Sequence, residues 1–375
     1  MISGKKNALG IALLMLLMAV TGVIVLRGQP LSLLGAALKQ LQPQYILLAL
    51  GFMFAYVSCE ALCTKQILGR LGHAAPFGRC LGYSFVGFYV SSITPSATGG
   101  QPAQIYYMSR DQIPAAHGAL NMMLIAACYQ IATLLWGGAV WFFVPGLSGQ
   151  MRGGLAVLLL YGGSIMIALT AGMAMVMFLP HAARKICGGV LRLLAKLRII
   201  KNPQKAWEKL ELQLAEYAKG AQCIKKNPGL TLRVLALCLV QLGMLFSVPW
   251  AVYLAFGQSG YTWAQVAGTQ ALVTLAVCNL PLPGAVGPAE GSFVSAFQFI
   301  FGAALVTPAM LVSRGISFYT FLLLSAGVAV AVHLRTSREI RERTLREMTA
   351  NSEKRRVKAV KRYLNTRSGP EGMVL

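Results

Sequence analysis

Six apolar stretches of the chain are each long enough to cross a lipid bilayer. They cover residues 8–26, 44–63, 117–144, 154–179, 230–256 and 308–334. A transmembrane helix needs about 20 consecutive, mostly apolar residues. Only 12% of all residues are charged, whereas soluble domains contain about 25%. The sequence therefore predicts an all-α polytopic membrane protein.

Two further apolar regions, 81–108 and 263–306, are interrupted by prolines and glycines. The first interruption reads TPSATGGQPAQ (94–104), and the second reads LPLPGAVGPAEG (280–291). Proline removes a backbone donor and glycine is costly to order in a helix, so both residues end helices. At membrane depth, broken backbone is tolerated only where protein or a water-filled cavity satisfies its polar groups. The two interruptions therefore indicate a site.

The distribution of basic residues predicts the topology. Lys and Arg number 11 against 3 acidic residues in 181–228, and 12 against 5 in 335–375. The positive-inside rule places both segments, the N-terminus and residues 64–80 in the cytoplasm. Even numbers of full spans separate these segments, so each broken region must enter and leave the membrane on one side. We expect a hairpin from the cytoplasmic side at 81–108 and one from the outside at 263–306.

The order of elements repeats in the second half of the chain. Two spans, a hairpin and a span make up residues 1–144, and the same order, upside down, makes up 154–334. The expected fold is an integral membrane domain, 1–334, with about six full spans and two re-entrant broken hairpins in an inverted repeat, a layout of secondary transporters. The halves are linked by a cytoplasmic segment, 181–228, and a basic cytoplasmic tail, 335–375, follows.

The formal net charge of +23 is also typical of proteins that bind nucleic acids. Here the positive charges lie in connections and in the tail, so we expect no nucleic acid partner. These basic segments are suited to contact anionic lipid of the inner leaflet. An amphipathic stripe within 181–228 either lies on that leaflet or packs on the ends of the spans. The eight cysteines form no CxxC pair, and we expect no metal or cofactor.

The second limb of each hairpin is expected to begin a helix near the middle of the membrane. Unpaired N–H groups and the helix dipole at such a start favour an anion, for example a phosphate. The candidate binding residues are Pro95, Ser96, Thr98, Gly99, Gly100 and Gln101 in the first hairpin, and Pro283, Gly284, Gly287 and Glu290 in the second. Tight bending of packed helices, without a ligand, is the alternative explanation.

Glu290 is the one acidic residue that the sequence places deep in the membrane, whereas Glu60 is expected near a cytoplasmic end. An intramembrane carboxylate is energetically expensive and usually functional. Glu290 would pair with a cationic head group, carry a proton or cap its own helix. Arg314, about two turns into the last span, would hold a lipid phosphate or pair with Glu290.

The two interruptions, together with RGISFYTFLLLSAGV (314–328), resemble the lysylphosphatidylglycerol synthase transmembrane-domain family, the flippase domain of multiple peptide resistance factor. By that resemblance, the matching positions are Pro95, Ser96, Gly99, Gly100, Pro283, Gly284, Gly287 and Glu290. Gln101 stands where many members have an acid. In full-length members, a separate cytoplasmic acyltransferase domain transfers lysine from charged tRNA to phosphatidylglycerol, and the membrane domain moves the product to the outer leaflet.

The resemblance implies a lipid translocator of a bacterial inner membrane, with both termini in the cytoplasm. Its substrate would be an anionic or aminoacylated phospholipid such as lysyl-phosphatidylglycerol. About 40 residues follow the last span, too few for a synthase domain, so we expect no catalysis by the chain alone. Two other functions stay open: the membrane subunit of a split lysyltransferase with a separate acyltransferase chain, and an ion-coupled transporter of a small solute.

Overall fold

The computed structural model describes residues 39–144, 153–178, 185, 188–189, 203–280 and 282–367. These residues form helices and turns, without a strand among them. Five helical stretches are long and apolar enough to cross a membrane: Pro43–Arg70 (α3), Ala115–Phe143 (α6), Gly154–Met175 in α8 (Gly154–Phe178), Pro228–Ala255 (α11) and Pro283–Arg346. They overlap five of the six predicted spans, and the predicted span 8–26 lies outside the described residues.

The chain divides into two compact units, Met1–Ala329 and Val330–Leu375. Helix α14 (Phe321–Arg367) continues without interruption through the boundary between them. In the second unit, Arg335 and Glu339 lie one turn apart on this helix, with 3.6 Å between Nε and Oε1. The functional residues discussed below all belong to the first unit.

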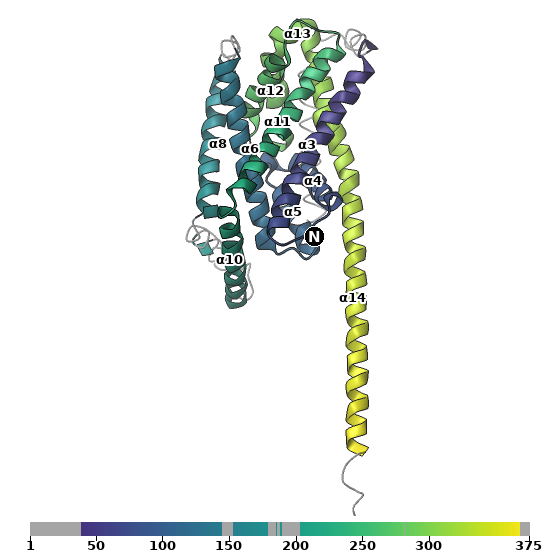
Figure 1. Ribbon diagram of the computed structural model, residues 1–375. Coiled ribbons are helices and arrows are strands. Elements are labelled where there is room, and N and C mark those ends of the chain that lie inside the picture. Colours follow the sequence, from purple (N-terminus) through teal and green to yellow (C-terminus); the bar gives the residue numbers. More distant parts are fainter. Residues whose placement is uncertain are drawn as a thin grey trace, which may run out of the picture. The chain divides into compact units, whose positions relative to one another are not determined.

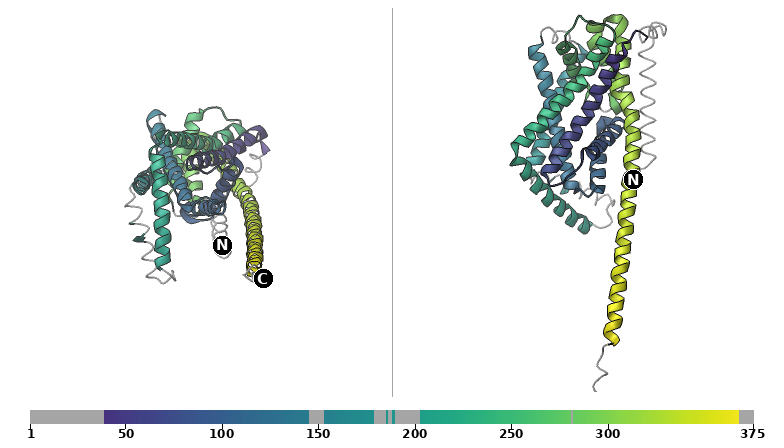
Figure 2. Two further views of the ribbon diagram at one scale, coloured as in Figure 1. Left: turned by 60° about the horizontal axis from the view of Figure 1, so that its bottom comes forward. Right: turned by 45° about the vertical axis from the view of Figure 1, so that its right-hand side comes forward.

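Helices α3 and α11 form the centre of the first unit and lie side by side (Figures 1 and 2). They run antiparallel. The Gln42 N–H before α3 donates to the Ala255 carbonyl at the end of α11 (3.0 Å). At the other end, the Cys223 thiol, just before α11, donates to the Arg70 carbonyl at the end of α3 (3.6 Å). Fully buried apolar side chains of both helices, among them Met53, form the common core.

The first hairpin consists of α4 (Phe77–Ser92), a short 3₁₀ turn η1 (Pro95–Ala97) and α5 (Gly100–Arg110). The first turns of α4 lie beside the end of α5, because Asp111 after α5 accepts a hydrogen bond from the Tyr83 hydroxyl of α4. Arg79 of α4 lies 4.0 Å from the same carboxylate. This hairpin enters the bundle from the end at which α3 finishes and α6 begins (Figure 1).

The second hairpin consists of α12 (Trp263–Val277), a 3₁₀ turn η2 (Pro283–Ala285) and the first part of α13 (Pro288–Arg314). A capping box of Thr262 and Gln265 starts α12. Gly302, with a φ of 71°, breaks α13 and separates the hairpin from the last span. The Tyr261 hydroxyl before α12 donates to the Phe299 carbonyl just before this break (2.8 Å), so both ends of the hairpin lie together.

The two hairpins enter the bundle from opposite ends, and their tips meet. Trp263, at the start of α12, donates to Ser247 in the last turns of α11 (2.9 Å), which places the second hairpin at the end opposite to the first (Figure 1). The turns η1 and η2 contact each other. Ile93, Val286 and Phe318 form a small apolar cluster at this contact. The predicted pair of opposed broken hairpins is confirmed.

The last span contains an irregular turn. After Arg314 the chain forms one π-helical turn, η3 (Gly315–Thr320), before it continues as α14. The Thr320 hydroxyl donates to the Gly315 carbonyl (2.8 Å). A π turn holds an extra residue compared with an α-helix, and such turns are frequent at functional sites.

The amphipathic stripe of the linker belongs to α10 (Pro203–Lys225) and packs on the bundle. Tyr217, Ala221 and Ile224 are buried in the main core, next to α6 and α11. Leu212, on another face, is 68% exposed. Of the two interpretations of the stripe, the structure therefore shows packing on the helix ends for these three residues.

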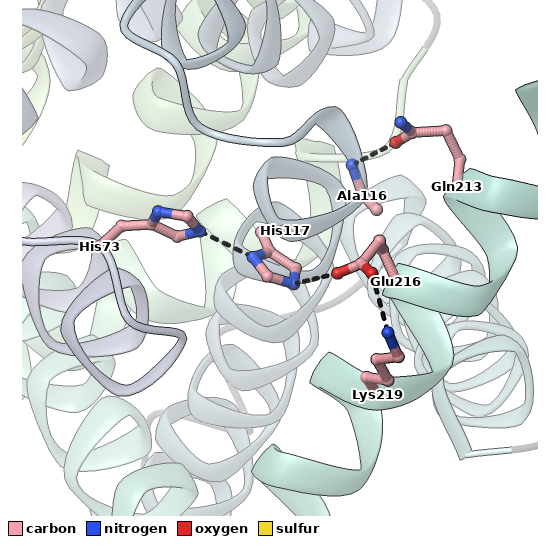
Figure 3. A network of polar contacts seen from close by, with 6 residues as sticks. All are labelled: His73, Ala116, His117, Gln213, Glu216 and Lys219. Atoms are coloured by element: carbon pink, nitrogen blue, oxygen red, sulfur yellow. Dashed lines mark hydrogen bonds and ion pairs between the residues drawn. The ribbon is translucent and has the colours of Figure 1, made fainter.

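A chain of polar contacts attaches α10 to the end of the bundle at which α3 finishes and α6 begins (Figure 3). His73 Nε2 lies 2.8 Å from His117 Nδ1, and His117 Nε2 lies 3.9 Å from a Glu216 carboxylate oxygen of α10. Lys219 donates to Glu216 (3.0 Å) and thereby lowers the pKa of that carboxyl. Gln213 accepts a hydrogen bond from the second-residue N–H of α6 (3.1 Å). The histidine contact was not predicted, because the two residues are distant in the sequence.

Candidate functional site

Both hairpin tips contain the same five-residue pattern, Pro-x-Ala-x-Gly, at 95–99 and 283–287. The second and third residues of both patterns have positive φ angles: 51° and 53° for Ser96 and Ala97, and 59° and 50° for Gly284 and Ala285. In both turns, the alanine N–H donates to the carbonyl of the residue before the proline (3.2 and 3.1 Å). The predicted repeat depended on topology alone, and this pattern adds a local match between the halves.

A cavity of about 490 Å³ lies beside the meeting point of the two tips. Residues of η1 and η2 line it together with residues of α3, α4, α5, α6, α11, α12, α13 and η3. Its polar lining includes Tyr56, Glu60, Gln101, Gln104, Gln270 and Arg314. Polar and charged groups are expensive inside a membrane and usually mark a pathway or binding site, so this cavity is the candidate site.

The predicted site residues fall into two groups. Ser96, Gln101, Gly284 and Arg314 line the cavity. The turns beside it contain Pro95, Thr98, Gly99, Gly100, Pro283, Gly287 and Glu290, which are not part of this lining. Gly100 shows what such a residue contributes: a Cβ there would lie 2.6 Å from the Gly87 carbonyl and 2.0 Å from the Ser91 hydroxyl. This glycine therefore allows α5 to pack closely against α4.

The Glu290 carboxylate makes two polar contacts at the second tip. One carboxylate oxygen accepts the Gly287 N–H (2.7 Å), which caps α13, and the other accepts Arg314 Nε (2.7 Å). Arg314 Nη2 also donates to the Gly284 carbonyl (2.9 Å), and the guanidinium lies 4.5 Å from the centre of the Phe318 ring. Helix capping and ion pairing, both expected as alternatives, therefore occur together.

The two members of this pair face the cavity differently. The Glu290 side chain is 3% exposed, whereas that of Arg314 is 16% exposed and lines the cavity. The carboxylate that caps α13 already places a negative charge at the start of that helix. Glu290 therefore positions Arg314, and the guanidinium is the charged group that the second tip presents to a ligand.

Glu60, which the sequence places near a cytoplasmic end, lines the cavity and lies ten residues before the end of α3. The apolar run ends at 63, but α3 continues through the polar residues Thr64 and Lys65 to Arg70. Glu60 therefore lies within the helical segment and not at its end, and its carboxylate lies beside the first hairpin. Its Oε1 accepts a hydrogen bond from Gln104 Nε2 of α5 (2.8 Å).

Metal binding has no support in the part of the chain that the structure describes. No group of three His, Cys, Asp or Glu side chains is arranged there to hold an ion. The charged groups in and beside the cavity are the Arg314 guanidinium and the Glu60 and Glu290 carboxylates, which suit a charged organic ligand.

The chain matches a known protein family. The model of the lysylphosphatidylglycerol synthase TM region matches residues 7–325. This range contains both hairpins, Glu60 and Arg314. No curated protein matches the chain.

Proposed function

Since the chain belongs to the lysylphosphatidylglycerol synthase TM-region family, we propose that it moves a phospholipid across a bacterial inner membrane. The lipid has an anionic or aminoacylated head group, such as that of lysyl-phosphatidylglycerol. The observation that carries this proposal is a cavity with charged and polar side chains in its lining, at the tips of two hairpins from opposite ends of an apolar bundle. The acyl chains stay in the lipid while the head group passes through the cavity.

Arg314 is the group that binds the lipid phosphate in this proposal. A guanidinium has five N–H donors in a planar fork, and two of its nitrogens are used by Glu290 and the Gly284 carbonyl. The Nη1 donors remain for phosphate oxygens, which guanidinium groups bind with strong, charge-assisted hydrogen bonds. The first turn of α5, next to Gln101, adds unpaired backbone N–H groups.

The opposed hairpins provide a route for alternating access. Each one closes the cavity from a different end of the bundle, so tilting one half against the other opens the cavity to one side at a time. In this proposal the two halves tilt about the contact between η1 and η2. The movement changes the side of the membrane to which the cavity is open. The head group stays in place while the path to it changes.

The test is lipid exchange between the leaflets of reconstituted vesicles. Fluorescent phosphatidylglycerol and lysyl-phosphatidylglycerol are followed by chemical quenching of the label that reaches the outer leaflet. The informative variant is the double change Glu290→Gln and Arg314→Gln, because removing one charge alone would leave its partner buried and unpaired. We expect wild-type protein to accelerate exchange and the double variant, verified as folded, to lose most of that acceleration.

Glu208→Gln is the matched control for this experiment. Glu208 is an exposed residue of α10 outside the cavity lining, so the same change from carboxylate to amide should preserve exchange. Wild-type exchange by the folded double variant would contradict a path past Arg314. No acceleration of either lipid by wild-type protein would contradict lipid movement itself.

A further inference from the structure

The cavity contains a second charged side chain that the proposed phosphate site does not use. Glu60 shares one face of α3 with Tyr56 and Met53, which lie four and seven residues earlier, and all three line the cavity. Gln104 donates to its carboxylate. Among the described residues, no Lys, Arg or His forms an ion pair with Glu60.

Gln104 adds a free acceptor next to this carboxylate. Its side-chain NH₂ group donates to Glu60, so its carbonyl oxygen points elsewhere, and that buried oxygen has no partner in the described structure. The residue is 4% exposed and lines the cavity. Buried polar atoms are usually hydrogen-bonded, so this oxygen is an acceptor that is available to a donor group of a ligand.

Gly87 leaves the space that the Gln104 amide occupies beside Glu60. A Cβ at residue 87 would lie 2.1 Å from Gln104 Nε2, closer than any contact between unbonded atoms. The missing side chain on α4 therefore makes the space in which the amide reaches Glu60. The arrangement depends on three helices, α3, α4 and α5.

With Glu60 in its ionised form, the charges around the cavity do not balance without a ligand. Arg314 is neutralised by Glu290 at 2.7 Å, whereas Glu60 has an amide as its partner. These three groups together carry one net negative charge. A ligand that completes the site therefore brings a positive group with several N–H donors, and a primary ammonium has three.

We propose that Glu60 and Gln104 form a subsite for a primary ammonium group. This inference rests on the proposed function and narrows it: the preferred lipid is aminoacylated, with its phosphate on Arg314 and its ammonium between Glu60 and Gln104. A lipid that has a phosphate but no amine occupies the Arg314 part of the site and leaves the Glu60 and Gln104 part empty. Glu60 is then the residue that sets the specificity.

The experiment is a binding titration of purified full-length protein in detergent. The ligands are phosphatidylglycerol and its lysyl ester with identical acyl chains. We expect wild-type protein to bind the lysyl ester at least about tenfold more tightly, as a hydrogen-bonded charge pair allows. Glu60→Gln should abolish this preference by weakening the lysyl ester alone, and Glu208→Gln should retain it.

Gly87→Ala is a second variant that leaves the carboxylate in place. The new methyl group displaces the flexible end of Gln104, so we expect the preference for the lysyl ester to fall without a change in phosphatidylglycerol affinity. This variant decides the matter if Glu60→Gln does not fold. Equal weakening of both lipids in every folded variant would overturn the ammonium subsite.

Lysine methyl ester, a soluble amine, separates this inference from the proposed function. If neither lipid binds but the soluble amine binds wild-type protein and not Glu60→Gln, the ammonium subsite is supported and lipid movement is contradicted. If the lysyl lipid binds with the expected preference and the soluble amine competes weakly, both are supported. Lipid binding without any preference for the amine contradicts the subsite alone.

Discussion

The two hairpin tips share one backbone turn but stabilise it with different chemistry. In the first tip, the Thr94 hydroxyl accepts the Gly99 N–H (3.1 Å), and the Ser91 hydroxyl donates to the Ala97 carbonyl (3.3 Å). In the second tip, Glu290 accepts the corresponding glycine N–H and also pairs with Arg314. One tip is thus neutral, and the other depends on a buried ion pair.

The range of these contacts along the chain differs as well. The side-chain contacts of the first tip join residues three to six positions apart, whereas Arg314 bonds to residues 24 and 30 positions away. The second tip is therefore fastened to the last span, and the first is fastened to its own hairpin. The same backbone turn is thus bonded to a neighbouring helix in one half of the molecule and only to its own hairpin in the other.

Removing Arg314 should have the largest effect on stability. Arg314→Leu leaves the Glu290 carboxylate buried and unpaired and removes a donor from the Gly284 carbonyl, so we expect a loss of about 3–5 kcal/mol. The measurement is the free energy of unfolding in detergent, from denaturant titration. The double change Glu290→Gln and Arg314→Gln should recover most of this loss. If Arg314→Leu were as stable as wild type, the second tip would not depend on its ion pair, and the contrast between the two tips would be contradicted.

Exchanging the second residue of the two turns tests how alike they are. Gly284→Ser should destabilise by about 1–3 kcal/mol, because a Cβ at 284 would lie 2.3 Å from the Phe318 ring. Ser96→Gly should change stability by less than about 1 kcal/mol, since glycine adopts the φ of 51° without strain. Both changes are followed by thermal unfolding. Equal effects of the two changes would mean that the tips are packed alike, contrary to the structure.

The smallest expected effect concerns the neutral cap of the first tip. Thr94→Val keeps the shape and removes the hydroxyl that accepts the Gly99 N–H, so we expect a loss of about 1 kcal/mol, as for other helix caps. Thr98→Val is the control, because the Thr98 hydroxyl is exposed and bonds to the Pro95 carbonyl. Thermal unfolding measures both, and a larger loss for Thr98→Val would show that the cap is assigned wrongly.

Much of the fold could be predicted from the sequence, because local chemistry determines it. Pro288 and Glu290 are a typical helix start, and α13 begins there. The breaks at 94–99 and 282–287 follow from prolines and glycines, which interrupt helices. These features do not depend on which helix packs against which.

The site was predicted only in part, because it depends on depth and on contacts between distant residues. Glu60 was placed at the end of its span, since hydropathy falls after 63 although the helix continues. Gln104 was not considered, because its importance comes from contacts with Glu60 and Gly87 on other helices. The sequence identified Arg314 and Glu290 but left their pairing open, which the distance of 2.7 Å decides.

The π turn between Arg314 and α14 has a consequence for the phase of this helix. One additional residue in a turn shifts all later side chains by about 100° around the axis relative to a regular α-helix. Phe321, which packs edge-on against Phe88 of the other half, faces the bundle because of this shift. Deleting one residue from 315–320 would therefore turn the downstream aromatic residue away from its neighbour while Arg314 kept its place, and the two walls of the cavity would lose their common alignment.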